Sequence, residues 1–486
     1  MNTVNPFANG CRLAAMLTTG VCMAALSSGC VVGPNYVGPP SVAAASLQKG
    51  GFARNGGLPF DTTPPPARWW ESLDDATLTQ LIDDALAASP TLESAEARVR
   101  GARAQVLIQQ SKHLPSGGAD AAYVRARIPA GSLSSIDVYS AAFDATWELD
   151  LFGATRRGIE GARASADSAQ AAFEDAQVQL AAQVAQDYAN LRAAQVHLRL
   201  TEQSVGLRSK AAALTQQRVD HGTAAEVDLD RELADLRQAR AQVPTGRAQV
   251  ELQLDQLAML AGREPGSLDA ILGGEEPATA SVPAPPARVA VGTPAEWLRR
   301  RPDIRGAERM LAARNAAIGQ NVAAYFPNVS LLGFFGATAS APSGLGRGTP
   351  LSVVAPTLSW SFLDIPRTRA NVRSAEADRD QALADYRRAV LQALQDANSS
   401  LERFGRLELA MQDLQVARDS AARAAQLTRQ RYAAGTATLI DSLDTERQRM
   451  AAEDQLVSAQ ADLMIAYVSL QKSLGLGWGE GGRVAL

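Results

Sequence analysis

The sequence predicts a fold of long helical hairpins and short amphipathic strands, with one unit built twice. The first observation is a duplication at a constant offset of 213 positions (431 − 218), which relates Arg218, Gly222 and Asp228 to Arg431, Gly435 and Asp441. The second is that all 24 prolines avoid residues 130–243 and 367–486, where apolar residues recur at helical spacing. The third is a period-two alternation in two pairs of segments. Together these predict a tandem repeat of α-helical and transmembrane β elements.

Composition excludes several classes of protein. Aromatic residues make up 5% of the 486 positions, which suits long, closely packed helices better than a globular enzyme core. The net charge is 47 − 51 = −4 with scattered Lys and Arg, so no nucleic-acid surface is indicated. No cysteine follows Cys30, and the three histidines lack metal-ligand spacing. We therefore expect neither a metal site nor catalysis, and no cofactor apart from a covalent lipid.

The N-terminus predicts a lipoprotein. Residues 1–29 combine Arg12, an apolar run and small residues, as a secretory signal does, and the run ends at Gly29-Cys30. We predict that Cys30 is lipidated and begins the mature chain; the alternative is ordinary cleavage beside an incidental cysteine. The next residue is Val31, and the absence of Asp at this position resembles lipoproteins that are sorted to the outer membrane. Residues 30–66, rich in Pro and Gly, are predicted to form an extended strap.

Four segments alternate apolar and polar residues and are predicted to be strands: about 119–128, 136–149, 328–340 and 351–362. Strands of about ten residues with one apolar face are typical of a transmembrane β-barrel. The alternative is a soluble hairpin packed on a core, which a duplicated pair beside a lipoprotein signal disfavours. Four strands cannot close a barrel, and open edges are not tolerated in lipid, so several chains must share one barrel.

Helical periodicity dominates the rest of the chain. A helix over 156–219, 64 residues long (219 − 156 + 1), would reach roughly 95 Å. A second helix returns to about Ala261 after a tip at Gly222, and the copy returns to about Leu474 after a tip at Gly435. The predicted domains are a first repeat, 67–261; a linker, 262–294; a second repeat, 295–474; and a tail, 475–486.

Several motifs resemble those of the TolC/OprM outer-membrane factors, in particular NodT-type efflux lipoproteins. They are Cys30-Val31-Val32-Gly33-Pro34-Asn35-Tyr36, Trp69-Trp70 with Leu73-Asp74-Asp75, Trp147 to Gly153, Arg300 to Ile304, Ala324 to Pro327 and the two Gly-Thr tips. The resemblance covers essentially the whole mature chain. It implies a homotrimer with a shared 12-stranded β-barrel in the outer membrane and a periplasmic α-barrel tunnel. It also implies two protein partners, a periplasmic adaptor and an inner-membrane transporter of the resistance-nodulation-division (RND) type.

The same resemblance assigns roles at the tips. Asp441 and Asp444 match the aspartates that narrow the family's tunnel, Asp228 is their counterpart in the first hairpin, and Tyr432 matches a gate tyrosine. Arg447 is a further candidate donor to the carboxylates. The alternative is that these aspartates occupy an ordinary solvated helix face. The adaptor is expected to dock on Gly222-Thr223 and Gly435-Thr436, which also have a simpler role as turn formers.

Two departures from the family pattern stand out. A family arginine two residues after the second tip glycine is Ala437 here, which puts that ionic link in doubt. The family's Asp-Gly-Gly-Arg after the last strand is Asp364-Ile365-Pro366-Arg367.

The leading hypothesis is a passive outer-membrane duct of a tripartite efflux pump that exports drugs or other small molecules. The alternatives are the duct of a type I protein-secretion system and, from another class, a structural coiled-coil envelope lipoprotein.

Overall fold

The computed structural model describes residues 31–42, 57, 60–61, 63–128, 134–273, 281–345 and 349–478. The predicted signal peptide and Cys30 lie outside these residues. The chain divides into two compact units. A sheet unit contains residues 31–40, 98–170 and 306–387, and a hairpin unit contains the described parts of 41–97, 171–305 and 388–486. Among the described residues, no helix is both long and apolar enough to cross a membrane.

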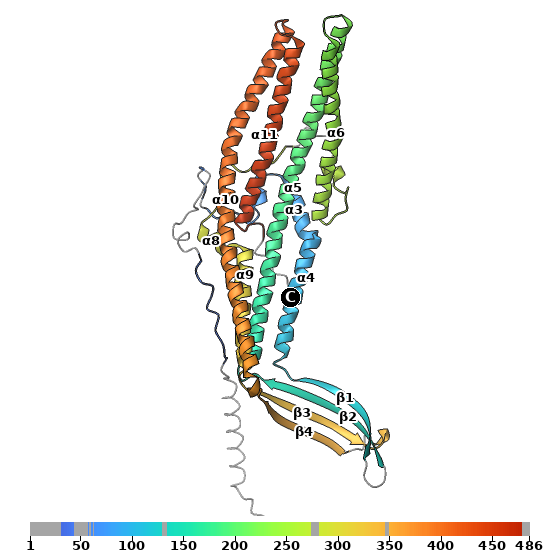
Figure 1. The fold of residues 1–486 in the computed structure, drawn as a ribbon, viewed down its shortest axis with the longest axis vertical. Coiled ribbons are helices and arrows are strands. Elements are labelled where there is room, and N and C mark those ends of the chain that lie inside the picture. Colours follow the sequence, from blue (N-terminus) through green and yellow to red (C-terminus); the bar gives the residue numbers. More distant parts are fainter. Residues whose placement is uncertain are drawn as a thin grey trace, which may run out of the picture. The chain divides into compact units, whose positions relative to one another are not determined.

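The sheet unit holds one antiparallel sheet in the order β1-β2-β3-β4 (Figure 1). Its strands are β1, Ser116–Ile128; β2, Ser134–Leu149; β3, Asn328–Ala339; and β4, Thr349–Ser359. The prediction of four strands is confirmed, but the predicted end of the last strand, at residue 362, is wrong. The indole Nε1 of Trp360 donates a hydrogen bond to the Tyr325 carbonyl (3.1 Å), and Phe362–Asp364 forms a 3-10 turn, η4.

The two faces of this sheet differ as an amphipathic strand pattern requires. The register pairs Phe143 with Phe335 on one face, where these side chains are 66% and 59% exposed. Tyr123 stacks on Tyr139 on the same face, with ring centroids 4.7 Å apart. The opposite face carries polar groups, such as the Ser330 and Thr357 hydroxyls, which lie 2.7 Å apart. Broad aromatic exposure on one face and polar groups on the other are typical of a sheet with lipid on one side.

Two long helical hairpins build the hairpin unit (Figure 1). In the first, α5 (Ala154–Asp220) is followed by α6 (Glu226–Leu260); in the second, α10 (Ile365–Ala433) is followed by α11 (Leu439–Ser473). The helices α5 and α10 begin in the sheet unit and continue into the hairpin unit. The predicted helix over 156–219 is therefore confirmed, and Pro244 lies inside α6 without ending it.

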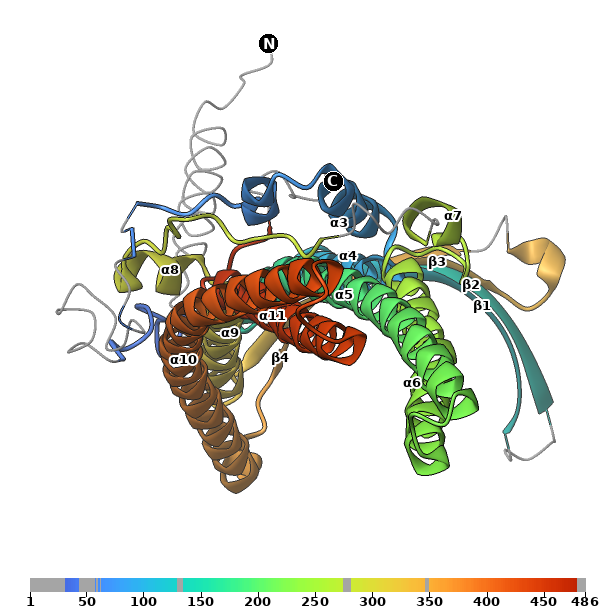
Figure 2. The ribbon, with the colours of Figure 1, turned by 90° about the horizontal axis from the view of Figure 1, so that it is seen from above.

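Several shorter elements complete the described part of the chain. They are η1, Trp69–Leu73; α3, Ala76–Ala88; α4, Pro90–Ser111; α7, Asp269–Leu272; α8, Pro294–Arg300; α9, Pro302–Ala323; and η3, Pro342–Gly344. Figure 2 shows α3 beside the row of long helices, on the side of α5 and α11. Asp75 caps α3 by accepting a hydrogen bond from the Leu78 amide (3.0 Å), as Asp at an N-cap should.

The motif that begins with Trp69-Trp70 forms part of the core of the hairpin unit. Both indoles are 1% exposed, and Trp69 packs edge-on against Tyr467 of α11, with centroids 5.8 Å apart. The Tyr188 hydroxyl donates to Asp75 Oδ2 (2.9 Å), and burial raises the pKa of Tyr188 to about 12. These contacts attach α3 to both hairpins, so the motif is explained by packing rather than by chemistry.

In the sheet unit, the strap is held by the buried Arg157 of α5. Its guanidinium donates to the carbonyls of Val32 and Gly33 (3.2 Å each) and to Asn35 Oδ1 (2.7 Å). Gly33 has φ +88°, and a Cβ there would lie 2.3 Å from the Cα of Gly319. Glycine is thus required both by the backbone conformation and by the close approach of the strap to α9.

Candidate functional site: the hairpin tips

Both hairpins turn through the same helix-ending motif. The amide of Thr223 donates to the Arg218 carbonyl (2.8 Å), and the amide of Gly222 donates to the Val219 carbonyl (2.8 Å). This pattern of bonds around a left-handed glycine (φ +70°) is a Schellman motif. The second tip repeats it with Gly435 at φ +73° and Thr436, whose amide donates to the Arg431 carbonyl (2.8 Å).

The glycines are needed at the tips for their backbone conformation alone. A Cβ built at Gly222 or at Gly435 would meet no atom within 4 Å. The tips therefore end in open surface, and the predicted role of these glycines as turn formers is confirmed. The structure does not test adaptor docking on Gly222-Thr223 and Gly435-Thr436, which stays a prediction.

Asp441 has a structural role that the motif comparison missed. It forms a capping box with Thr438: Asp441 Oδ2 accepts from the Thr438 amide (2.9 Å) and hydroxyl (2.7 Å), and Thr438 Oγ1 accepts from the Asp441 amide (3.1 Å). The side-chain hydrogen bond from Thr438, followed by the backbone bond, lowers the pKa of Asp441. The spacing Thr438-x-x-Asp441 was readable in the sequence as a helix start.

The first hairpin lacks this box, although it keeps the carboxylate. Asp228 occupies the corresponding third position of α6, but the N-cap is Ala225, which has no side-chain oxygen. Asp228 instead lies 3.7 Å from the Arg231 guanidinium on the same exposed helix face. The duplicated tips therefore differ in how their aspartates are held.

Asp444 lies one turn along α11 and is 54% exposed. Arg447 lies 3.4 Å from its Oδ1, as the sequence suggested for this candidate donor, and Gln448 Nε2 donates to Oδ2 (3.3 Å). Arg447 also lies 3.9 Å from Asp235 of α6, which in turn lies 3.2 Å from Arg208 of α5. A series of oppositely charged side chains therefore links Asp444 to the first hairpin of the same protomer.

Tyr432 is 42% exposed, and among the described residues its hydroxyl makes no hydrogen bond. Its carbonyl accepts from the Gly435 amide (2.9 Å). The tips therefore present exposed carboxylates near the beginnings of α6 and α11, with partial neutralisation by arginine.

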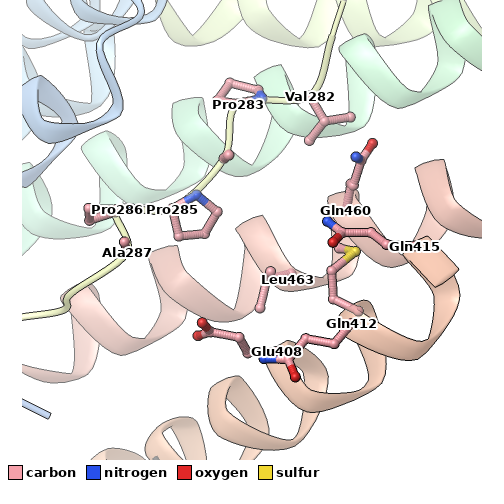
Figure 3. A pocket seen from close by; sticks show the side chains of 12 residues that line it. Val282, Pro283, Pro285, Pro286, Ala287, Glu408, Gln412, Gln415, Gln460 and Leu463 are labelled. Atoms are coloured by element: carbon pink, nitrogen blue, oxygen red, sulfur yellow. The ribbon is translucent and has the colours of Figure 1, made fainter. Parts of the chain in front are cut away.

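A cavity of about 240 Å³ lies farther from the tips, between the linker and the second hairpin (Figure 3). The linker residues Val282 to Ala287 form one wall; the glutamines 412, 415 and 460 and the carboxylate of Glu408 come from α10 and α11. Burial raises the pKa of Glu408. Among the described residues, no group of His, Cys, Asp and Glu could hold a metal ion.

Comparison with known proteins identifies the family. The family model described as "Outer membrane efflux protein" matches residues 81–263 and 293–476, which is more than half of the chain. This chain belongs to the outer membrane efflux protein family. Among similar curated proteins, Outer membrane protein OprJ of Pseudomonas aeruginosa is 32% identical over 465 residues, covering 93% of this chain and 94% of OprJ.

Two further relatives agree. Nodulation protein T of Rhizobium leguminosarum bv. trifolii is 28% identical over 470 residues, covering 93% of this chain and 96% of that protein. The solved structure of the outer-membrane channel OprN matches with a TM-score of 0.81 and 34% identity, covering 92% of this chain and all of the OprN chain. The predicted resemblance to the outer-membrane factors is thereby confirmed.

This outer membrane efflux protein is accordingly a channel of the outer membrane with a large periplasmic part, and it serves as the exit duct of a tripartite efflux system. Its fold class is that of the trimeric channels, so each chain contributes four strands to a shared 12-stranded barrel. Lipidation of Cys30 and the roles of the tip residues stay predictions.

Proposed function

We propose that the outer membrane efflux protein is gated at its periplasmic end by rings of Asp441 and Asp444, with Asp228 and Tyr432 close to them. The observation that carries this proposal is the exposure of Asp444, one turn from the tip, with Arg447 as its arginine partner. Threefold symmetry repeats each carboxylate three times around one axis. Like charges held together repel one another, so a closed ring binds cations.

The test must separate the charge of Asp441 from its role as a helix cap. Replacement by Ala removes both, so Asp441→Ala should also weaken the start of α11. The variant Asp441→Asn/Asp444→Asn removes the charges and keeps a side-chain oxygen at each position. We expect planar-bilayer recordings to show a strong block of the wild type by a trivalent cation on the periplasmic side, and a loss of most of that block in the variant.

A matched control is Asp419→Asn, which neutralises an aspartate of α10 that is 53% exposed and lies outside the tip. It should leave the block unchanged. Equal block in the wild type and in the double variant would show that the tip carboxylates do not form the gate.

The proposed partners are a periplasmic adaptor at Gly222-Thr223 and Gly435-Thr436, and an RND-type inner-membrane transporter behind it; catalysis has no part in this function. Support comes from the relatives, which include the Solvent efflux pump outer membrane protein SrpC of Pseudomonas putida. A photo-crosslinker at Thr436, with mass spectrometry of the products, should capture an adaptor that pairs with an RND pump. Capture of an ABC-exporter adaptor would favour type I secretion.

We also propose lipidation of Cys30, which would attach the strap to the membrane. Intact-mass analysis of the mature protein should show a diacylglycerol-modified N-terminus, and Cys30→Ser should abolish it. An unmodified wild-type N-terminus would refute this assignment. The barrel should insert in both proteins, because its apolar face does not depend on the lipid.

A further inference from the structure

A second cavity, in the sheet unit, is larger than the one in the hairpin unit and is lined by several charged side chains. It has a volume of about 560 Å³ and lies among the strap, α4, α5 and α9. Tyr36 of the strap lines it, together with His113 at the end of α4 and one face of α5 that carries Arg156, Glu160, Arg163 and Asp167. Arg309 and Ala312 of α9 complete the wall.

Most of the charged groups in this cavity are already paired. Arg156 bonds to Asp150, with Nε to Oδ2 at 3.2 Å, and Glu160 accepts from Arg157 (2.7 Å). Arg309 forms an ion pair with Glu308, and its guanidinium lies 5.9 Å from the centre of the Tyr36 ring.

Arg163 and Asp167 are different. They lie four positions apart on α5, a spacing at which opposite charges usually meet. Within the described residues, neither makes a hydrogen bond or an ion pair, although Asp167 does act electrostatically on Arg309. The cavity therefore presents one uncommitted cation and one weakly engaged anion, one helical turn apart.

The level of the cavity relative to the membrane follows from two tryptophans at strand ends. The indole of Trp147 donates to the His113 carbonyl (2.9 Å), and that of Trp360 donates to the Tyr325 carbonyl (3.1 Å). Tryptophan at the ends of membrane strands marks the interface with water. Because His113 also lines the cavity, one end of the cavity lies at the level of these strand ends.

Arg163 lies on the membrane side of Asp167 along α5. Arg163 lies nine residues after the first residue of α5 (163 − 154), which is roughly 14 Å along the helix. Side chains on a helix lean toward its N-terminus, and here that end follows β2 and faces the membrane. Asp167 lies one turn farther into the periplasm.

We propose that this cavity binds the phosphoethanolamine headgroup of a phospholipid in the periplasmic leaflet of the outer membrane. In such a lipid the phosphate lies nearer the acyl chains and the ammonium lies beyond it, joined by a two-carbon bridge. Arg163, which lies nearer the membrane, binds the phosphate. Asp167, which lies one helical turn farther into the periplasm, binds the ammonium. An anionic headgroup without an amine would leave Asp167 unpaired and repelled, so the order of charges selects a zwitterionic lipid.

The strap makes the site accessible to lipid. If Cys30 is acylated, its chains must lie in the leaflet, so the strap that carries Tyr36 runs along a lipid-accessible face. The proposal rests on the outer-membrane location and on this lipidation, but not on the tip gate. Native mass spectrometry reports the covalent anchor and a bound lipid as separate mass differences, so failure of one is distinguishable from failure of the other.

The experiment is native mass spectrometry of the full-length trimer in a mild detergent, titrated with phosphatidylethanolamine or phosphatidylglycerol. We expect the wild type to bind phosphatidylethanolamine in preference to phosphatidylglycerol. Arg163→Gln should weaken binding of both lipids about tenfold, because it removes the phosphate partner. Asp167→Asn should abolish the preference while phosphate binding remains. Arg314→Gln, at an exposed arginine of α9 outside the cavity, is the matched control and should behave as the wild type.

Three results would overturn the proposal. The first is a wild-type trimer that binds neither lipid, as expected if a neighbouring copy of the chain covers the cavity. The second is equal loss of lipid in Arg163→Gln and Arg314→Gln. The third is competition by soluble phosphoethanolamine at the same concentration as the lipid, which would make the cavity a small-molecule site rather than a leaflet site.

Discussion

The hydrogen bonds from Arg157 to strap residues 32–35, which we call the Arg157 clamp, give the sharpest test of how the strap is held. The Arg157 side chain is 3% exposed and donates three hydrogen bonds to these residues. A hydrogen bond from a charged donor contributes roughly 1.5–3 kcal/mol, but Gly33 and Asn35 are exposed and can bond to water when Arg157 is lost. We therefore expect Arg157→Met to destabilise docking of the strap by roughly 2–4 kcal/mol.

Hydrogen–deuterium exchange measures this loss directly. The Val32 amide donates to the Phe152 carbonyl (3.2 Å), so its protection reports strap docking. A loss of 2–4 kcal/mol lowers the protection roughly 30- to 700-fold, since 1.4 kcal/mol corresponds to tenfold. Arg157→Lys, which keeps the charge but not the fork of donors, should give an intermediate loss. Unchanged protection of Val32 in Arg157→Met would refute the clamp.

Three further predictions follow from the fold. Gly262→Ala should lower Tm far more than Gly435→Ala does. Both glycines have positive φ, but only a Cβ at position 262 would clash with a carbonyl, at 2.3 Å from the Ala88 oxygen; an equal loss of Tm in the two variants would contradict this. Burial raises the pKa of Asp175, so the charged carboxylate destabilises the folded protein at pH values above that pKa. Asp175→Asn should therefore raise Tm at pH 7, and the gain should shrink as the pH falls through the folded pKa; a lower Tm at pH 7 would refute this prediction. Asp120 and Asp144 share the polar face of the sheet, so Asp120→Asn/Asp144→Asn should reduce cation selectivity in reversal-potential measurements, and an unchanged reversal potential would place both outside the conducting path.

Local sequence patterns predicted much of the architecture. The duplication, the helix spans, the glycine tips and the four strands were all readable because helical and strand periodicities are properties of neighbouring residues. The capping box of Asp441 belongs to the same local class, since Thr438 is three residues away. It went unread because the family resemblance supplied another role for that aspartate.

Contacts between distant residues were not readable. Arg157 holds carbonyls more than 120 positions earlier, and Arg447 approaches Asp235 of the other hairpin. The incorrect end of β4 has the same origin, because Trp360 bonds to a carbonyl of the preceding helix–strand junction rather than continuing the strand. A helical period fixes which face a residue occupies, but not which distant partner that face meets. The sequence therefore determined the elements and the class of this channel, whereas the tertiary structure alone decided how the strap is clamped and which charges stay unpaired beside the membrane.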